Sequence, residues 1–198
     1  MKKIIYIILL LFIATPLFGQ STVIVAKKKA ACTYTSKNAQ AGTGASYAFN
    51  FAGGRNAAVS FAANGTYSPR RITVSLKKTG TPTATISFRI YQDAGESTSI
   101  TAPKTTALIT PSATLSSGDF TTDYADYTVD ITALETAELT NANIYWLDIV
   151  GTTSSSNYIS WQYSSSGSEE QDYEDEPVVT WVQNDTSTTG NFTIWSCE

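Results

Sequence analysis

The sequence contains no histidine, and this absence narrows the chemistry available to the protein. Ser-His and Cys-His nucleophile systems are excluded, because histidine is the base in both. The commonest general base and metal ligand of proteins is missing as well. Charged residues are also scarce, at 15% of 198 residues, and they form no basic stripe of the kind that neutralises phosphates. We therefore expect neither a histidine-dependent enzyme nor a nucleic-acid partner.

A long apolar segment is missing as well. The apolar run at residues 4–13 is shorter than the roughly 20 residues that a membrane-spanning helix needs. Two lysines precede this run, so residues 1–19 match a secretory signal peptide. Cleavage after Gly19 leaves Gln20 as the N-terminus, and cleavage after Ala26 is the alternative. The pattern predicts a secreted or cell-surface protein without a stable membrane span.

Without residues 1–19 the chain has 11 basic and 17 acidic residues, a net charge of −6. One acidic stretch, residues 169–176, accounts for this excess, and we place it in a hairpin loop between strands at residues 158–163 and 178–182. Three interpretations stay open: a solvated loop, a docking surface for a basic partner, and a calcium site. Calcium takes six to eight oxygen ligands, and its candidate ligands are Glu169, Glu170, Asp172, Glu174 and Asp175. The stretch lacks EF-hand spacing, so we favour the solvated loop; no other cofactor is predicted.

Alternation of apolar and polar residues with a period of two dominates the chain and predicts β-strands. Ile72, Val74 and Leu76 share one face of a strand, and residues 86–90 repeat the pattern. Turn residues at 79–83 separate the two runs, so we predict a hairpin with one buried face. Similar runs occur at residues 47–51, 57–62, 127–131, 143–150, 158–163, 178–182 and 191–197. The sequence thus predicts an all-β, antiparallel, jelly-roll-like sandwich, with residues 32–198 as a single domain.

Only two cysteines are present, Cys32 near the first strand of this domain and Cys197 near the end of the last. An even pair in an oxidising compartment favours a disulfide. If the first and last strands lie side by side and antiparallel, as in jelly-roll sandwiches, the two cysteines fall opposite each other. We predict that they are bonded.

Several segments carry a family resemblance. Their motifs are a hairpin with a Gly-x-Pro turn at Gly80, a strand containing Tyr145 and Trp146, and an aromatic strand that ends the chain. They resemble jelly-roll β-sandwich modules, akin to carbohydrate-binding modules, of bacterial secreted and surface-anchored proteins and phage particles. The resemblance spans about residues 45–196, with its clearest segments at 68–95, 127–151 and 157–167. It implies a non-catalytic module used for display, adhesion or glycan binding. The chain departs from the family at residues 140–143, where a glycine-containing turn is usual.

A glycan site is one hypothesis that alternation raises. Trp146 and Asp148 share one face of their strand, and Tyr145 shares the opposite face with two aliphatic residues. If the Tyr145 face is inward, Trp146 and Asp148 are exposed together, with Tyr158 and Gln162 on a neighbouring strand. Aromatic rings beside polar groups suit sugars. The alternative is that Trp146 only fills space between two partly buried faces, as we expect for Trp161; Trp195 cannot be assigned to a face.

Carboxylate pairs are the remaining route to catalysis, since glycosidases use two acids. The candidates are Asp126, Asp130 and Asp148, of which the first two lie near the ends of a predicted strand. Solvated acids are ordinary at such positions, so we expect no enzyme activity.

The N-terminal arm, residues 20–31, suggests an assembly device. Its uncharged, β-branched segment (Thr22, Val23, Ile24, Val25 and Ala26) precedes three lysines. Such a segment is prone to aggregate when free, and it would be sheltered by adding to a sheet edge of another subunit. The alternatives are that it pairs within its own domain or is removed with the signal peptide.

Taken together, these features favour a structural or adhesive subunit of a cell-surface fibre or appendage, whose partners are copies of itself or other surface subunits. A carbohydrate-binding module with glycan partners is the first alternative. A phage virion structural or decoration protein is the second, and it is disfavoured because a signal peptide would export the chain before assembly.

Overall fold

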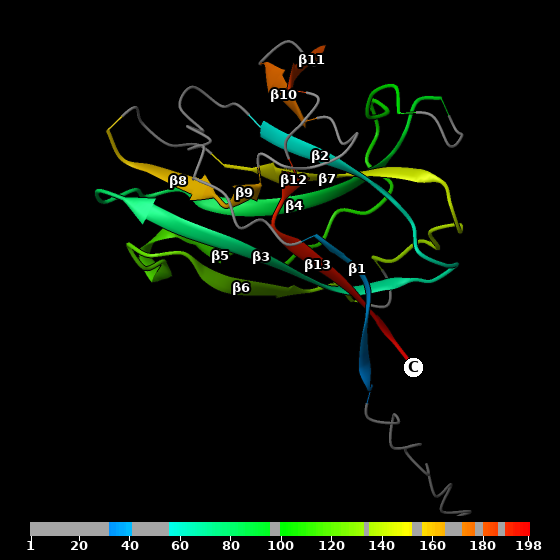
Figure 1. Cartoon of the computed structure of the whole chain (residues 1–198). Coiled ribbons are helices and arrows are strands. Elements are labelled where there is room, and N and C mark those ends of the chain that lie inside the picture. Colours follow the sequence, from blue (N-terminus) through cyan, green and yellow to red (C-terminus); the bar gives the residue numbers. More distant parts are fainter. Residues whose placement is uncertain are drawn as a thin grey trace, which may run out of the picture. The chain divides into compact units, whose positions relative to one another are not determined.

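The computed structural model describes residues 32–40, 56–95, 100–132, 135–151, 156–164, 172–176, 180–185 and 189–198, with side chains left out at residue 56 and across residues 163–189. All described residues belong to one compact unit, Cys32–Glu198. Two antiparallel sheets pack as a sandwich, which confirms the predicted all-β sandwich class (Figure 1). The one helical element in the described part is the short 3-10 turn η1, Ser117–Asp119.

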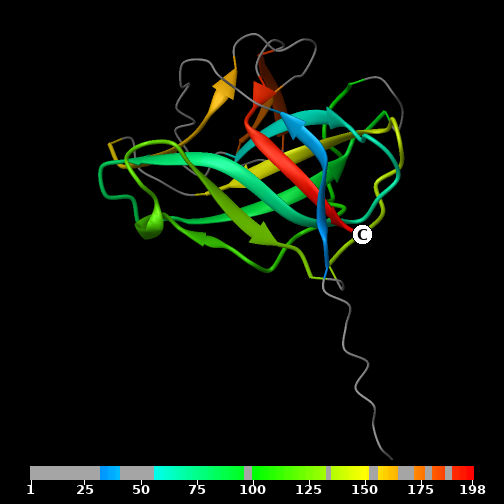
Figure 2. The same ribbon diagram turned by 60° about the horizontal axis from the view of Figure 1, so that its bottom comes forward.

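The first sheet has the strand order β1-β13-β3-β6, and β8 pairs with the far end of β3. Figure 2 shows β1 (blue) and β13 (red) lying side by side. The bounds are Tyr34–Gln40 (β1), Phe192–Cys197 (β13), Pro69–Thr79 (β3), Ala125–Asp130 (β6) and Tyr158–Trp161 (β8).

The second sheet has the order β11-β10-β2-β7-β4-β5. A separate two-stranded pair joins β9 to β12. The bounds are Thr180–Asp185 (β11), Asp172–Glu176 (β10), Asn56–Ala62 (β2), Ile144–Val150 (β7), Thr85–Gln92 (β4), Leu115–Ser116 (β5), Tyr163–Ser164 (β9) and Thr189–Gly190 (β12). The predicted strand at residues 47–51 lies outside the described residues.

The core lies between the two sheets and is built by the alternating residues that the sequence indicates. Ile72, Val74 and Leu76 of β3 are fully buried, and so are Ile86, Phe88 and Ile90 of β4. Burying one such side chain stabilises the fold by about 1.5–3 kcal/mol. Period-two alternation therefore identified the inward face of both strands correctly.

The predicted hairpin between these strands is wrong, because β3 and β4 belong to different sheets. The chain leaves the first sheet after Thr79 and enters the second at Thr85. At the connection, Gly80 has a φ of 70°, and an added Cβ would come within 2.3 Å of the side-chain oxygen of Asn157. That oxygen accepts a hydrogen bond from the amide of Thr81 at 2.8 Å. The turn residues thus connect the two layers instead of two neighbouring strands.

The acidic stretch also differs from the prediction. Asp172–Glu176 forms β10, which pairs with β2 on one side and β11 on the other, so this part is a strand and not a loop. The following strand begins at Thr180, and residues 177–179 lie outside the described part. Acidic residues have low strand propensity, and pairing on both sides of β10 overrides that local preference.

Candidate functional site

The outer face of the first sheet gathers aromatic and polar side chains in two rows. In one row, Trp195 of β13 lies opposite Arg71 of β3, which lies opposite Asp130 of β6. In the next row, Thr193, Thr73 and Thr128 occupy the same three strands. We define the outer patch as six residues of this face: Tyr34, Arg71, Thr73, Thr128, Asp130 and Trp195.

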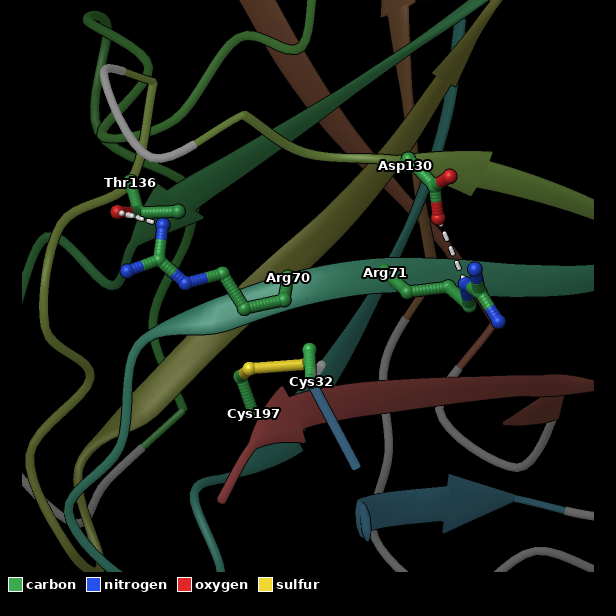
Figure 3. The surroundings of a disulfide bond; sticks show 6 residues. All are labelled: Cys32, Arg70, Arg71, Asp130, Thr136 and Cys197. Atoms are coloured by element: carbon green, nitrogen blue, oxygen red, sulfur yellow. Dashed lines mark hydrogen bonds and ion pairs between the residues drawn. A yellow bond between two sulfur atoms is a disulfide. The ribbon is translucent and has the colours of Figure 1, made fainter. Parts of the chain in front are cut away.

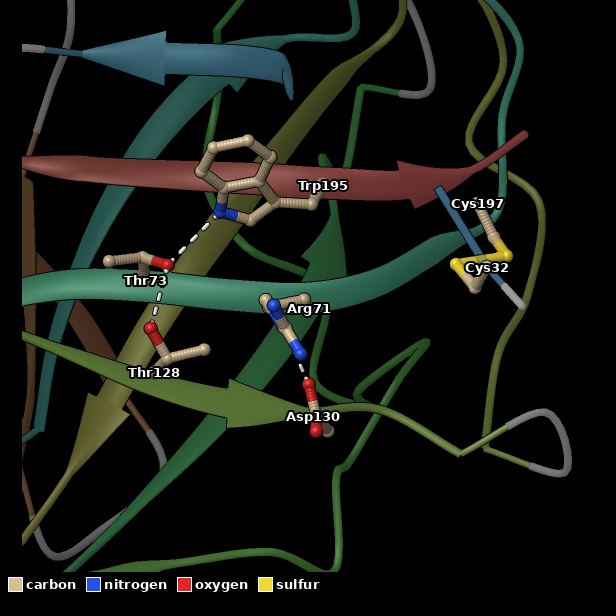
Figure 4. A network of polar contacts seen from close by, with 7 residues as sticks. All are labelled: Cys32, Arg71, Thr73, Thr128, Asp130, Trp195 and Cys197. Atoms are coloured by element: carbon tan, nitrogen blue, oxygen red, sulfur yellow. Dashed lines mark hydrogen bonds and ion pairs between the residues drawn. A yellow bond between two sulfur atoms is a disulfide. The ribbon is translucent and has the colours of Figure 1, made fainter. Parts of the chain in front are cut away.

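Arg71 connects two strands across this patch. Its Nε donates to Oδ1 of Asp130 at 2.7 Å (Figure 4). Its guanidinium carbon lies 3.7 Å from the centre of the Tyr34 ring. The hydrogen bond to Asp130 is the largest cause of a raised pKa for Arg71, so the side chain is always cationic. The Asp130 side chain is 63% exposed, and an exposed pair contributes only about 0–1 kcal/mol to stability. The contacts therefore fix the orientation of Arg71 more than they stabilise the fold.

Trp195 lies on the same face and is half-buried. Its Nε1 donates to Oγ1 of Thr73 at 3.0 Å, and that hydroxyl lies 3.0 Å from Oγ1 of Thr128 (Figure 4). The chain of three polar groups holds the indole against the sheet. Alternation alone could not assign Trp195 to a face, because the short last strand offers few neighbours, and the structure places it outward.

The disulfide between Cys32 and Cys197 lies at one end of this face and is confirmed, with the two Cα atoms 5.3 Å apart (Figure 3). Strands β1 and β13 are adjacent and antiparallel, with Tyr34 opposite Cys197. Close by, Nη1 of Arg70 donates to Oγ1 of Thr136 at 3.0 Å. The segment just before β1 is thus covalently joined to the end of the last strand.

The glycan hypothesis requires Trp146 and Asp148 to be exposed, and it is wrong because both side chains are fully buried. Tyr145 does face the main core, which is the condition under which that hypothesis expected Trp146 to be exposed. Trp146 forms a second, smaller cluster on the other side of the sheet with Ala58 and Tyr91, covered by Ile100, Ala102 and Ala107. No sugar ring can stack on an indole in this position, so the structure supports the space-filling alternative.

Asp93 holds the covering segment over Trp146. The Asp93 carboxylate is fully buried and accepts a hydrogen bond from Nε1 of Trp146 at 2.9 Å. It also accepts backbone N–H bonds from Gly95, Thr101 and Ala102 at 2.8, 2.9 and 3.2 Å. Four donors satisfy the buried charge. Its role is therefore structural, and the sequence pattern did not single it out.

Asp148 lies beside Arg89 on the same outer side of the second sheet, with Oδ2 3.9 Å from Nη1. The guanidinium also donates to the hydroxyl of Tyr91 at 3.2 Å. Since Asp148 is fully buried, a nearby cation offsets part of the cost of keeping a charged group away from water.

Tyr158 and Gln162 do not neighbour Trp146, which corrects the prediction. Tyr158 begins β8 in the first sheet, opposite Thr79, whereas Trp146 is in β7 of the second. Oε1 of Gln162 accepts a hydrogen bond from Asn191 at 3.0 Å. Trp146 and Asp148 therefore belong to the second sheet, whereas Tyr158 belongs to the first and Gln162 follows β8 directly. Trp161, expected in the core, is fully buried.

The candidate catalytic acids are not arranged as a glycosidase pair. Asp126 and Asp130 lie on the outer face of the first sheet, and Asp148 lies on the outer side of the second. Asp126 and Asp130 are four residues apart on one strand, about 13 Å at 3.3 Å per residue. Glycosidase carboxylates are about 5–9.5 Å apart, so no two of these three acids match that geometry.

The calcium and assembly hypotheses concern residues that the structure describes only in part. Glu169 and Glu170 lie outside the described residues, and Asp172, Glu174 and Asp175 are described only as backbone of β10. Within the described part of the chain, no cluster of three or more potential metal-ligating side chains occurs. The arm with residues 22–26 also lies outside. Both hypotheses stay predictions.

Comparison with known proteins adds no family. No protein-family model matches the chain, and no curated protein matches it in sequence. Across the described residues, the structure has no helix whose length and hydrophobicity suit a membrane span.

Proposed function

We propose that the protein is a secreted, non-catalytic structural or adhesive subunit of a cell-surface assembly. The observation that best supports this proposal is the bond between Cys32 and Cys197. Strand β1 is at the edge of its sheet and follows the N-terminal arm, so a load on the arm would peel it away. The disulfide transfers such a load to β13, which has neighbours on both sides. This arrangement suits a domain that is joined to others through its arm.

The arm supplies the proposed joint. Residues 22–26 are uncharged and mostly β-branched, which suits addition to a sheet edge of another subunit. The three following lysines separate this segment from the folded unit that starts at Cys32.

Assembly of protein beginning at Gln20, compared with protein beginning at Lys27, tests the proposal. Light scattering and negative-stain microscopy should show defined oligomers or fibres for the longer form and monomers for the shorter one. Ile24→Pro in the longer form is the matched variant, since it preserves arm length but removes a backbone donor. Monomers from both forms would overturn the proposal.

Glycan binding is the second candidate, and Trp195 favours it. Its half-buried indole lies on an accessible sheet face beside Tyr34 and the polar groups of Arg71 and Thr128. An aromatic ring with adjacent polar groups suits a sugar's apolar face and hydroxyl rim. Tryptophan fluorescence measured against a panel of soluble polysaccharides is the test. Quenching by one polysaccharide should be lost in Trp195→Ala. It should be kept in the control variant Leu108→Ala, which alters an exposed side chain elsewhere. If no polysaccharide quenches the fluorescence, that result counts against glycan binding.

A further inference from the structure

Each sheet ends in two edge strands, and these differ in how readily they could pair with another chain. In β1 the register is interrupted between Ser36 and Asn38, and Lys37 sits in the interruption. Both features discourage further pairing. β5 is only two residues long, and β11 pairs with β10 through an irregular register. β6 pairs with β3 over six residues without interruption. Among the described strands, β6 is thus the longest edge with a regular register.

The outward backbone groups of β6 can be assigned. The amide of Ile131 donates to the carbonyl of Arg70 at 2.8 Å, so Ile131 directs its backbone groups toward β3. In an antiparallel pair this property alternates along the strand. Asp126, Thr128 and Asp130 therefore direct their amides and carbonyls away from β3, toward the open edge, and their side chains are exposed.

We propose that β6 is the acceptor edge for residues 22–26 of a second copy of this chain. The inference rests on the proposed function and names the surface that receives the arm. Five arm residues match the length of residues 126–130. An antiparallel register with Thr22 opposite Asp130 brings Lys27–Lys29 alongside residues 123–125.

Charge complementarity favours this register. Asp123 and Asp126 are both exposed, and among the described residues neither has a cationic partner. Asp130, at the other end of β6, is already held by Arg71. In this register the lysines of the arm lie near Asp123 and Asp126. The uncharged end of the arm lies near Asp130, which is already paired with Arg71.

The reach of the arm favours a second copy over the same chain. β13 and β3 separate β1 from β6, so a strand added beyond β6 lies four strand spacings, about 19 Å, from β1. From Ala26 to Cys32 is six residues, about 20 Å when fully extended. To reach β6 of its own domain, the arm would have to be almost fully extended. The arm of another copy does not have to span this distance from its own β1.

A proline at Thr128 provides a selective test, since its amide points to the open edge and the β3 ladder keeps its hydrogen bonds. Protein from Gln20 with Thr128→Pro keeps the arm but lacks the acceptor. Protein from Lys27 keeps the acceptor but lacks the arm. We expect each to be monomeric alone and the mixture to form a one-to-one complex by light scattering. Assembly of the Thr128→Pro protein by itself, or a mixture that stays monomeric, overturns the acceptor assignment.

A synthetic peptide of residues 20–31 gives a second measurement that does not depend on the proline variant folding. The peptide should bind the protein that begins at Lys27. Asp126→Lys should weaken this binding by at least about tenfold, whereas Lys104→Glu, a distant charge reversal, is the control that should not weaken it. Equal binding to the Asp126→Lys protein overturns the assignment. If protein from Gln20 assembles while both acceptor tests fail, the proposed function stands and only the choice of β6 is wrong.

Discussion

Removing the disulfide by Cys32→Ser with Cys197→Ser is the prediction with the best-defined magnitude. The bridge closes a separation of 165 residues. In the chain-entropy model, a loop of this length loses about 17 cal/mol/K, or about 5 kcal/mol at 25 °C. A unit of about 170 residues has an unfolding entropy of about 0.35 kcal/mol/K. We therefore expect the melting temperature to fall by about 15 °C.

The assay is scanning calorimetry together with urea unfolding followed by tryptophan fluorescence. The double variant should remain folded, because β1 still pairs with β13 through Tyr34 and its neighbours. The urea m-value should rise, since the unbridged unfolded chain exposes more surface. Parent protein treated with reductant is the control and should match the variant. A fall of less than about 3 °C would refute the reasoning and imply that the bridge restrains only local fraying of β1.

Three further predictions concern single residues. Asp93→Asn should destabilise the fold by about 2–4 kcal/mol, because it replaces a buried carboxylate that accepts four hydrogen bonds, and near-ultraviolet circular dichroism of Trp146 should change with it. Ala142→Gly should stabilise the fold by about 0.5–1 kcal/mol, measured by urea unfolding. Ala142 has a φ of 65°, which costs a non-glycine residue about 1–2 kcal/mol, and the chain entropy of glycine offsets only part of the gain. Destabilisation would contradict the turn geometry. Glu135 accepts hydrogen bonds from two backbone amides, and hydrogen bonds lower its pKa from 4.5 to about 2. The stability that ionised Glu135 contributes is present above pH 4.5 and is lost as pH falls toward 2. Glu135→Gln should therefore flatten the pH dependence of the free energy of unfolding between these two pH values. An unchanged pH profile would count against this role of the Glu135 hydrogen bonds.

Two hydrogen bonds surround the positive φ of Ala142, which lies in the turn at residues 140–143. The N–H of Ala142 donates to the carbonyl of Ala63 at 2.9 Å, and the N–H of Asn143 donates to Thr140 at 3.2 Å. These bonds hold the backbone in a conformation that glycine adopts more easily. The turn thus keeps an alanine in an unfavourable backbone conformation.

The glycan hypothesis shows where local pattern stops being informative. Alternation correctly separated Tyr145 from Trp146, since successive side chains in a strand point to opposite faces. It could not show that residues 100–107, about 40 positions earlier in the chain, cover Trp146 on the second face. An outward-facing residue is exposed only if nothing else packs there, and that depends on distant segments.

What the sequence by itself determined is local or compositional. Period-two alternation predicted strands and the buried faces of β3 and β4, and two cysteines at the ends of the domain predicted their bond. Only the tertiary structure decided which sheet each strand joins. It also decided that the turn after Thr79 connects the two layers and that Asp172–Glu176 forms a strand. The physical reason is that alternation records one strand's two faces, whereas its hydrogen-bonding partners come from segments far away in the chain.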